Sequence, residues 1–81
     1  MPSQESRPVE VYGKPGCMQC KFTVKELEKQ DIPHQYIDIS VNEVAAEQVK
    51  SMGFTTLPVV VAGESKWAGL KLDNIRGLRN G

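Results

Sequence analysis

The order of strand-like and helix-like patterns limits the fold of this chain more than any other sequence feature. Alternating apolar and polar residues predict strands at 8–12 and 34–39, and a valine run predicts a buried strand at 59–61. Apolar residues at helical spacing predict one helix over about 20–30 and a second helix that follows Ser40 and ends at Gly53. A hairpin strand is predicted at 66–68, before a last short helix. Two strands joined by a helix should be parallel, so the order βαβαββα predicts an α/β fold with a four-stranded mixed sheet and three helices.

The predicted helix before Gly53 and the last helix both carry capping signals. Ser40 stands three residues before Glu43, which is the capping-box pattern, so we expect Ser40 to cap the first of these helices. Its apolar face is predicted to comprise Val41, Val44, Ala45, Val49 and Met52. Asp73 is expected to cap the last helix, which holds Ile75 and Leu78.

Length and charge exclude several classes of protein. A chain of 81 residues has room for a single domain, predicted at 8–81 after a polar lead at 1–7. Ten Lys and Arg balance ten Asp and Glu, which argues against a general nucleic-acid or membrane-surface binder. The longest apolar run, 57–62, is too short to span a bilayer, and residues 1–7 lack the apolar stretch of a secretory signal. We therefore expect a cytoplasmic monomer with no membrane segment.

The motif that carries chemistry is Cys17-Met18-Gln19-Cys20, between the first predicted strand and the first predicted helix. At a helix N-terminus, free backbone N–H groups and the helix dipole favour a thiolate at Cys17, which is the predicted nucleophile. Cys20 lies one helical turn further on, at a spacing that permits a disulfide, and is the predicted resolving thiol. The stretch between Val11 and Lys25 holds three lysines, Lys14, Lys21 and Lys25, and no acidic residue, so its field is positive.

The cysteine pair also allows two other interpretations. A C-x-x-C segment is half of a zinc site, but His34 is the only histidine, so no complete metal site is predicted. The pair could also be two buried structural cysteines, although Pro15 and Gly16 before it favour an exposed turn. A non-catalytic metal-binding or interaction module is the alternative function from a different class.

Four segments resemble the thioredoxin superfamily and, within it, the glutaredoxin-like branch called NrdH-redoxins. They are Lys14-Pro15-Gly16-Cys17-Met18-Gln19-Cys20, Ile37-Asp38-Ile39, Leu57-Pro58-Val59-Val60-Val61 and Trp67-Ala68-Gly69-Leu70. The resemblance covers nearly the whole chain, from about Val9 to Leu78. It implies a thioredoxin fold, a cis Leu57–Pro58 peptide bond, and a thiol-disulfide oxidoreductase without a bound cofactor.

The same resemblance implies partners and binding residues. Members of the branch reduce the large subunit of ribonucleotide reductase, and thioredoxin reductase re-reduces them with electrons from NADPH. The predicted partner-binding residues are Lys14, Met18, Gln19, Leu57, Pro58, Trp67 and Gly69. Trp67 could instead be a core residue.

The chain departs from two family patterns in the segment that begins at Trp67. It has Trp67-Ala68-Gly69-Leu70-Lys71-Leu72 where the branch usually has Trp-Ser-Gly-Phe-Arg-Pro. Glutathione-binding glutaredoxins have a Gly-Gly pair and a following Asp, whereas here Asp73 stands at a different spacing. A glutathione-dependent glutaredoxin is therefore the alternative within the same fold.

Overall fold

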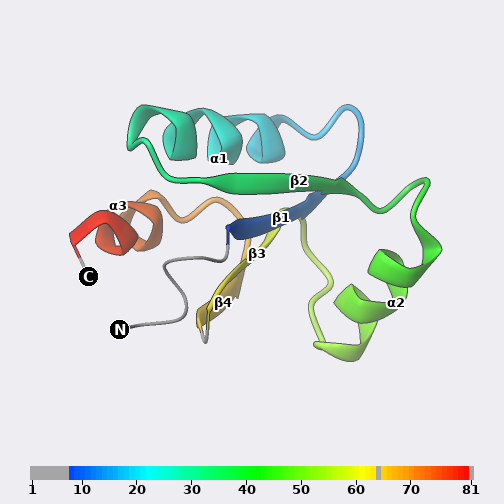
Figure 1. Cartoon of the computed structure of the whole chain (residues 1–81). Helices are drawn as coiled ribbons and strands as arrows, with labels where there is room; N and C mark the ends of the chain where they lie inside the picture. Colours follow the sequence, from blue (N-terminus) through cyan, green and yellow to red (C-terminus); the bar gives the residue numbers. More distant parts are fainter. Residues whose placement is uncertain (1–7, 64, 81) are drawn as a thin grey trace.

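The structure is a computed structural model that describes residues 8–63 and 65–80. The predicted polar lead at 1–7 and Glu64 of the predicted hairpin turn lie outside the described residues. The elements follow the predicted order (Figure 1): β1 (Val9–Gly13), α1 (Met18–Lys29), β2 (His34–Asp38), α2 (Glu43–Ser51), β3 (Val59–Ala62), β4 (Ser65–Ala68) and α3 (Leu72–Asn80).

The four strands form one mixed sheet in the order β2-β1-β3-β4. β1 and β2 are parallel, with Val11 opposite Tyr36. β3 is antiparallel to both β1 and β4, so the hairpin places β4 at one edge and β2 at the other. This arrangement confirms the predicted four-stranded thioredoxin-like fold with three helices.

Alternation along the strands produces two apolar layers, one on each face of the sheet. Leu27 from α1 and Ile75 from α3 pack on one face, and Ala45 and Val49 from α2 pack on the other. The first layer comprises Val9, Val11, Leu27, Val60, Trp67 and Ile75, and the second comprises Tyr12, Ala45, Val49 and Val59. The valines of β3 contribute to both layers, as expected for a strand buried on both faces.

The cap of α2 differs from the sequence-based expectation. Asn42, not Ser40, is the N-cap, and its side-chain oxygen accepts a hydrogen bond from the Ala45 N–H at 3.0 Å. Ser40 lies in the preceding turn, where its hydroxyl donates to the Asp38 carboxylate at 2.6 Å. Asn is as good a cap as Ser, and an Asp-centred turn competes for the Ser40 hydroxyl, so the helix begins at Glu43.

The later start of α2 leaves two predicted face residues outside the core. Val41 precedes the helix and is 81% exposed, and Val44 in its first turn is 70% exposed. Ala45 and Val49 do enter the core, and Met52 packs against it. The predicted apolar face was therefore wrong for Val41 and Val44 and right for the other three residues.

The N-terminus of α3 also differs by two residues. The helix begins at Leu72, so Asp73 lies in the first turn instead of capping it. A carboxylate in the first turn still interacts favourably with the positive end of the helix dipole. Ile75 is fully buried and Leu78 packs against the same layer, as the spacing predicts.

An ion pair joins α1 to α3. The Arg76 Nε donates to the Glu26 carboxylate at 3.2 Å, and the Gln30 side-chain amide donates to the same oxygen at 2.7 Å. The hydrogen bond from Gln30 is the main reason that the Glu26 pKa lies below its ordinary value, with a further contribution from Arg76 and partial opposition from burial.

This pKa shift predicts a pH-dependent contribution of Glu26 to stability. A carboxylate with a lowered pKa stabilises the fold above its unfolded-state pKa, and the contribution is lost as the pH falls through the folded-state pKa. We expect Glu26→Gln to lower the melting temperature at neutral pH and to lose this effect below pH about 4. Thermal unfolding across pH would measure it, with Glu28→Gln, an exposed residue of the same helix, as the control. A deficit that stayed constant down to acid pH would contradict the assignment.

Candidate active site

Three segments that the sequence singles out meet at one end of the strands β1, β3 and β4. Tyr12 of β1 lies opposite Val59, and Val59 lies opposite Ala68 of β4. Pro58, just before β3, and Gly69, just after β4, therefore lie beside each other, next to the loop that leaves β1. The Gly69 N–H donates to the Pro58 carbonyl oxygen at 2.8 Å, which joins two of these segments directly.

The two cysteines stand where this loop becomes α1, and they are joined by a disulfide. Their Cα atoms lie 5.2 Å apart, within the range that the spacing predicts. Cys17 is the N-cap of α1, and its sulfur accepts a hydrogen bond from the Cys20 N–H at 3.2 Å. Cys20 faces the sheet and is 1% exposed, whereas Cys17 is partly exposed. The outer sulfur is thus the one that another molecule can reach.

The turn before Cys17 is fixed by its own backbone. Gly16 has a φ of 81°, a left-handed conformation that glycine adopts without the penalty that a side chain would bring. The Cys17 N–H donates to the Lys14 carbonyl oxygen at 3.3 Å and closes the turn. The side chains of Lys14, Met18 and Gln19 are exposed around it, so the structure brings these predicted partner-binding residues together.

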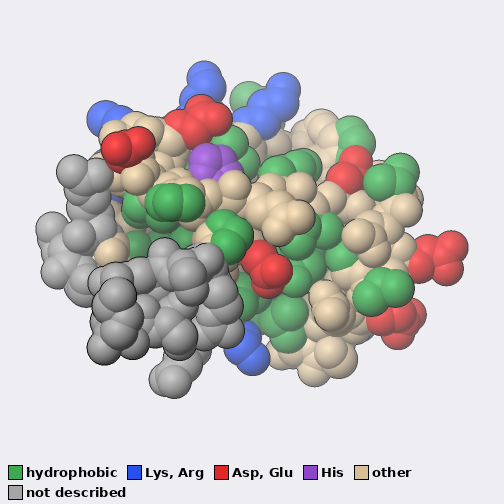
Figure 2. Space-filling model, viewed as in Figure 1, with side chains coloured by type: hydrophobic (Ala, Val, Ile, Leu, Met, Phe, Trp, Pro, Cys, Tyr) green, Lys and Arg blue, Asp and Glu red, His purple; other side chains and the backbone are tan. Residues whose placement is uncertain are grey.

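The charge around the cysteines has the predicted sign. The first turn of α1 holds no acidic residue, and Lys14, Lys21 and Lys25 are exposed. Figure 2 shows Lys and Arg side chains along the upper surface over α1, with acidic side chains among them at the left and further acidic side chains at the right over α2. Positive charge and the N-terminal end of the helix dipole both stabilise a thiolate at the N-cap.

The Leu57–Pro58 peptide bond is cis, as predicted. Pro58 is buried and Leu57 is partly buried against the α2 layer. Within the described residues, neither the N–H nor the carbonyl of Leu57 has a hydrogen-bond partner. Free backbone groups of this kind can pair with an extended peptide in the manner of an added strand.

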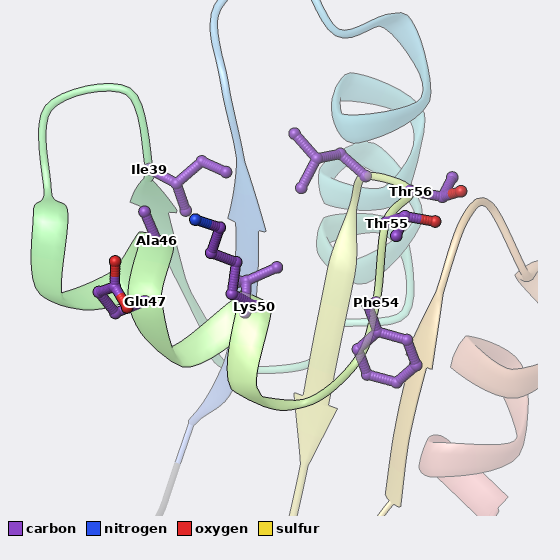
Figure 3. A pocket seen from close by; sticks show the side chains of 9 residues that line it. Ile39, Ala46, Glu47, Lys50, Phe54, Thr55 and Thr56 are labelled. Carbon is purple, nitrogen blue, oxygen red and sulfur yellow. The ribbon is translucent and has the colours of Figure 1, made fainter.

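A shallow cavity of about 320 Å³ adjoins Leu57 (Figure 3). It lies between α2 and the loop that leads to β3, and its lining is mainly apolar. Ile39, Val49 and Phe54 line it together with the stems of α2 side chains such as Lys50. This cavity was not predicted from the sequence, because it forms only where α2 packs beside the loop that follows it.

The structure corrects the predicted docking role of Trp67. Its side chain is 7% exposed and lies in the core layer with Val60, Leu27 and Ile75. The residue is opposite Val60 in the hairpin, so its indole points to the face covered by α1 and α3. Within the part of the chain that the structure describes, its Nε1 has no hydrogen-bond partner. Trp67 is therefore a core residue, the alternative that the sequence left open.

Tyr36 is a residue of this site that the sequence analysis missed. It lies on edge strand β2 opposite Val11, and its hydroxyl donates to the Lys14 carbonyl oxygen at 3.3 Å. The approach is possible because Gly13 has no side chain: a Cβ there would lie 2.7 Å from both the Cys20 Sγ and the Tyr36 hydroxyl oxygen. Its strand position was predictable, but the parallel register that brings its hydroxyl near the Cys20 sulfur was not.

In residues 8–63 and 65–80, no group of three or more His, Cys, Asp or Glu side chains could hold a metal ion. In the same residues, no helix is both long enough and apolar enough to cross a membrane.

The fold and the cysteine pair at the N-terminus of α1 define a dithiol-disulfide oxidoreductase with a thioredoxin fold. The glutaredoxin family model matches residues 9–67. The glutaredoxin-like protein NrdH of Escherichia coli strain K12 is 33% identical over 70 residues, which are 86% of each chain. NrdH of Salmonella typhimurium is 30% identical over 70 residues, again 86% of each chain.

Solved structures agree with the sequence comparison. The NrdH-redoxin from Escherichia coli superposes with a TM-score of 0.84 at 32% identity, over 88% of this chain and 93% of that chain. A glutaredoxin from Archaeoglobus fulgidus superposes with a TM-score of 0.75 at 25% identity, over 90% of this chain and 86% of that one. The chain therefore belongs to the glutaredoxin family, as one of its glutaredoxin-like NrdH redoxins.

Proposed function

We propose that this protein carries electrons from thioredoxin reductase to a disulfide of a protein partner, the large subunit of ribonucleotide reductase. The observation that carries the proposal is the asymmetry of the cysteine pair. Cys17 is reachable at the N-terminus of a helix in a positive environment, and Cys20 is buried one turn behind it. This asymmetry supplies an attacking thiolate and a protected second thiol.

The proposed reaction has two exchange steps. In the first step, the Cys17 thiolate forms a bond to one sulfur of the partner disulfide, and the other partner sulfur leaves as a thiolate. In the second step, the Cys20 thiolate attacks Cys17, forms the disulfide seen in the structure and releases the second partner thiolate. The redoxin loses two electrons, the partner disulfide gains them, and each released thiolate takes a proton from water.

The free backbone of Leu57 supports a peptide-like substrate. Its N–H and carbonyl lie at the same end of the strands as the cysteine loop and can pair with the chain on either side of a partner cysteine. Lys14, Met18, Gln19 and Gly69 surround this end of the sheet and are the proposed contacts of the partner. Because Trp67 is buried, it is no longer part of this set.

Two lines of support favour thioredoxin reductase over glutathione as the electron donor. The solved NrdH-redoxin of Escherichia coli is described as having a thioredoxin-like activity profile. In addition, Ala68 precedes Gly69 where glutathione-binding glutaredoxins have a Gly-Gly pair, and Asp73 lies inside α3. The exposed lysines near Cys17 favour any anion, so the glutathione-dependent alternative is compared directly in the test.

We expect the dithiol to be regenerated faster by thioredoxin reductase with NADPH than by glutathione with glutathione reductase. The measurement is NADPH oxidation at a fixed concentration of disulfide substrate, once through each reductase, with Cys17→Ser as the blank in both assays. Ribonucleotide reductase turnover supported by the first system then tests the partner. Faster regeneration by glutathione would make the protein a glutathione-dependent glutaredoxin and overturn the proposed donor.

A further inference from the structure

The hydroxyl of Tyr36 occupies an unusual place for a residue on an edge strand. Its ring is exposed, but its oxygen reaches under the first turn of α1. The Cys20 sulfur and this oxygen both lie 2.7 Å from the point where a Cβ of Gly13 would stand. A Cβ at position 13 would collide with both atoms, so the bare glycine lets the hydroxyl and the sulfur approach the same place.

The hydroxyl can donate one hydrogen bond, and in the disulfide form of the protein that hydrogen bond is weak. Its acceptor is the Lys14 carbonyl oxygen, at 3.3 Å. That distance is long for an O–H···O hydrogen bond, which is usually about 2.7–2.8 Å. The same carbonyl already accepts the Cys17 N–H at 3.3 Å, so it keeps a partner if the hydroxyl turns away.

We propose that Tyr36 is a positioning residue for the resolving step, in which its hydroxyl donates a hydrogen bond to the Cys20 sulfur once the disulfide is open. The inference rests on the proposed function, because it requires Cys20 to attack the mixed disulfide. Cys20 is 1% exposed, and burial disfavours a thiolate. A hydrogen bond from a phenol to an anionic sulfur is charge-assisted and offsets part of that loss.

The protonation state of the Tyr36 hydroxyl suits a hydrogen-bond donor. Burial first, and then the negative charge of Asp38, raise the pKa of Tyr36 above its ordinary value, so the hydroxyl keeps its hydrogen at neutral pH. The hydrogen stays on the oxygen throughout. In the resolving step, the Cys20 sulfur forms its bond to Cys17 and the partner sulfur leaves, and the proton lost by Cys20 goes to water.

The test separates the two steps with dithiobis-nitrobenzoate, which releases one coloured thiolate when Cys17 attacks and a second when Cys20 resolves the adduct. Rapid mixing of the reduced protein with this reagent gives a rate for each step. We expect Tyr36→Phe to slow the second release about three- to tenfold and to leave the first unchanged. The factor is limited because a less stabilised thiolate is rarer but also more nucleophilic.

Tyr12→Phe is the matched control, since it removes a hydroxyl from the neighbouring strand but on the opposite face of the sheet. That hydroxyl bonds to Glu10 and Gln48, away from the sulfurs. Both release rates should equal those of the wild-type protein. A second control combines Tyr36→Phe with Cys20→Ser, and this double variant should show an unaltered rate of Cys17 attack.

Two outcomes would overturn this inference alone. Resolution by Tyr36→Phe at the wild-type rate would show that the hydroxyl does not act on Cys20. An equal slowing of the first release, also in the Cys20→Ser background, would show that it acts on the active-site turn through the Lys14 carbonyl. If Cys20→Ser itself released two thiolates, the proposed role of Cys20 would fail, and this inference with it.

Discussion

Cys20→Ser stops multiple turnover and leaves the redoxin covalently joined to its partner through Cys17. The serine hydroxyl is not ionised at neutral pH and cannot displace the partner sulfur, so the mixed disulfide has no internal route of escape. Cys17→Ser, by contrast, removes the first step, and we expect activity to fall by roughly two orders of magnitude or more with no adduct at all.

The two variants form a matched pair, because each replaces one sulfur by one oxygen at positions three residues apart. Mass spectrometry under non-reducing conditions would detect the adduct, and the thioredoxin reductase assay would measure turnover. A trapped adduct on Cys17→Ser, with none on Cys20→Ser, would reverse the proposed roles. Full turnover by Cys20→Ser without an adduct would show that the buried thiol is not needed.

The position of the reactive pair was predictable because its chemistry is local. A C-x-x-C segment between a strand pattern and a helix pattern fixes both the N-cap position of Cys17 and the burial of Cys20 one turn later. The order of strands and helices was predictable for the same reason, because periodicity is read over short windows of sequence. The cis bond before Pro58 came instead mainly from the family resemblance.

Features that depend on register or on competing turns were not predictable. The role proposed for Tyr36 needs the pairing of Val11 with Tyr36 and a bare position at Gly13, neither of which a single strand pattern reveals. Ser40 and Asn42 both suit a helix cap, and only the Asp38 turn that captures Ser40 decides between them. Trp67 was ambiguous because either face of a hairpin strand can be the buried one.

The different environments of Val44 and Val49, both in α2, predict a large difference between two identical substitutions. Val49 is 6% exposed and packs with Tyr12, Ala45 and Val59, whereas Val44 is 70% exposed. We expect Val49→Ala to lower the free energy of unfolding by about 2 kcal/mol, because two buried methyl groups are lost and a cavity forms. For a domain of this size, that corresponds to a fall of about 10 °C in melting temperature.

Val44→Ala is the internal control, because it makes the same chemical change in the same helix. Both variants gain the better helix propensity of alanine, worth up to about 0.5 kcal/mol, so this gain cancels when they are compared. We therefore expect Val44→Ala to be neutral or slightly stabilising in urea and thermal unfolding. A cost for Val44→Ala as large as that for Val49→Ala would mean that both valines are buried in solution, and that the helix presents the wider apolar face its sequence pattern predicted.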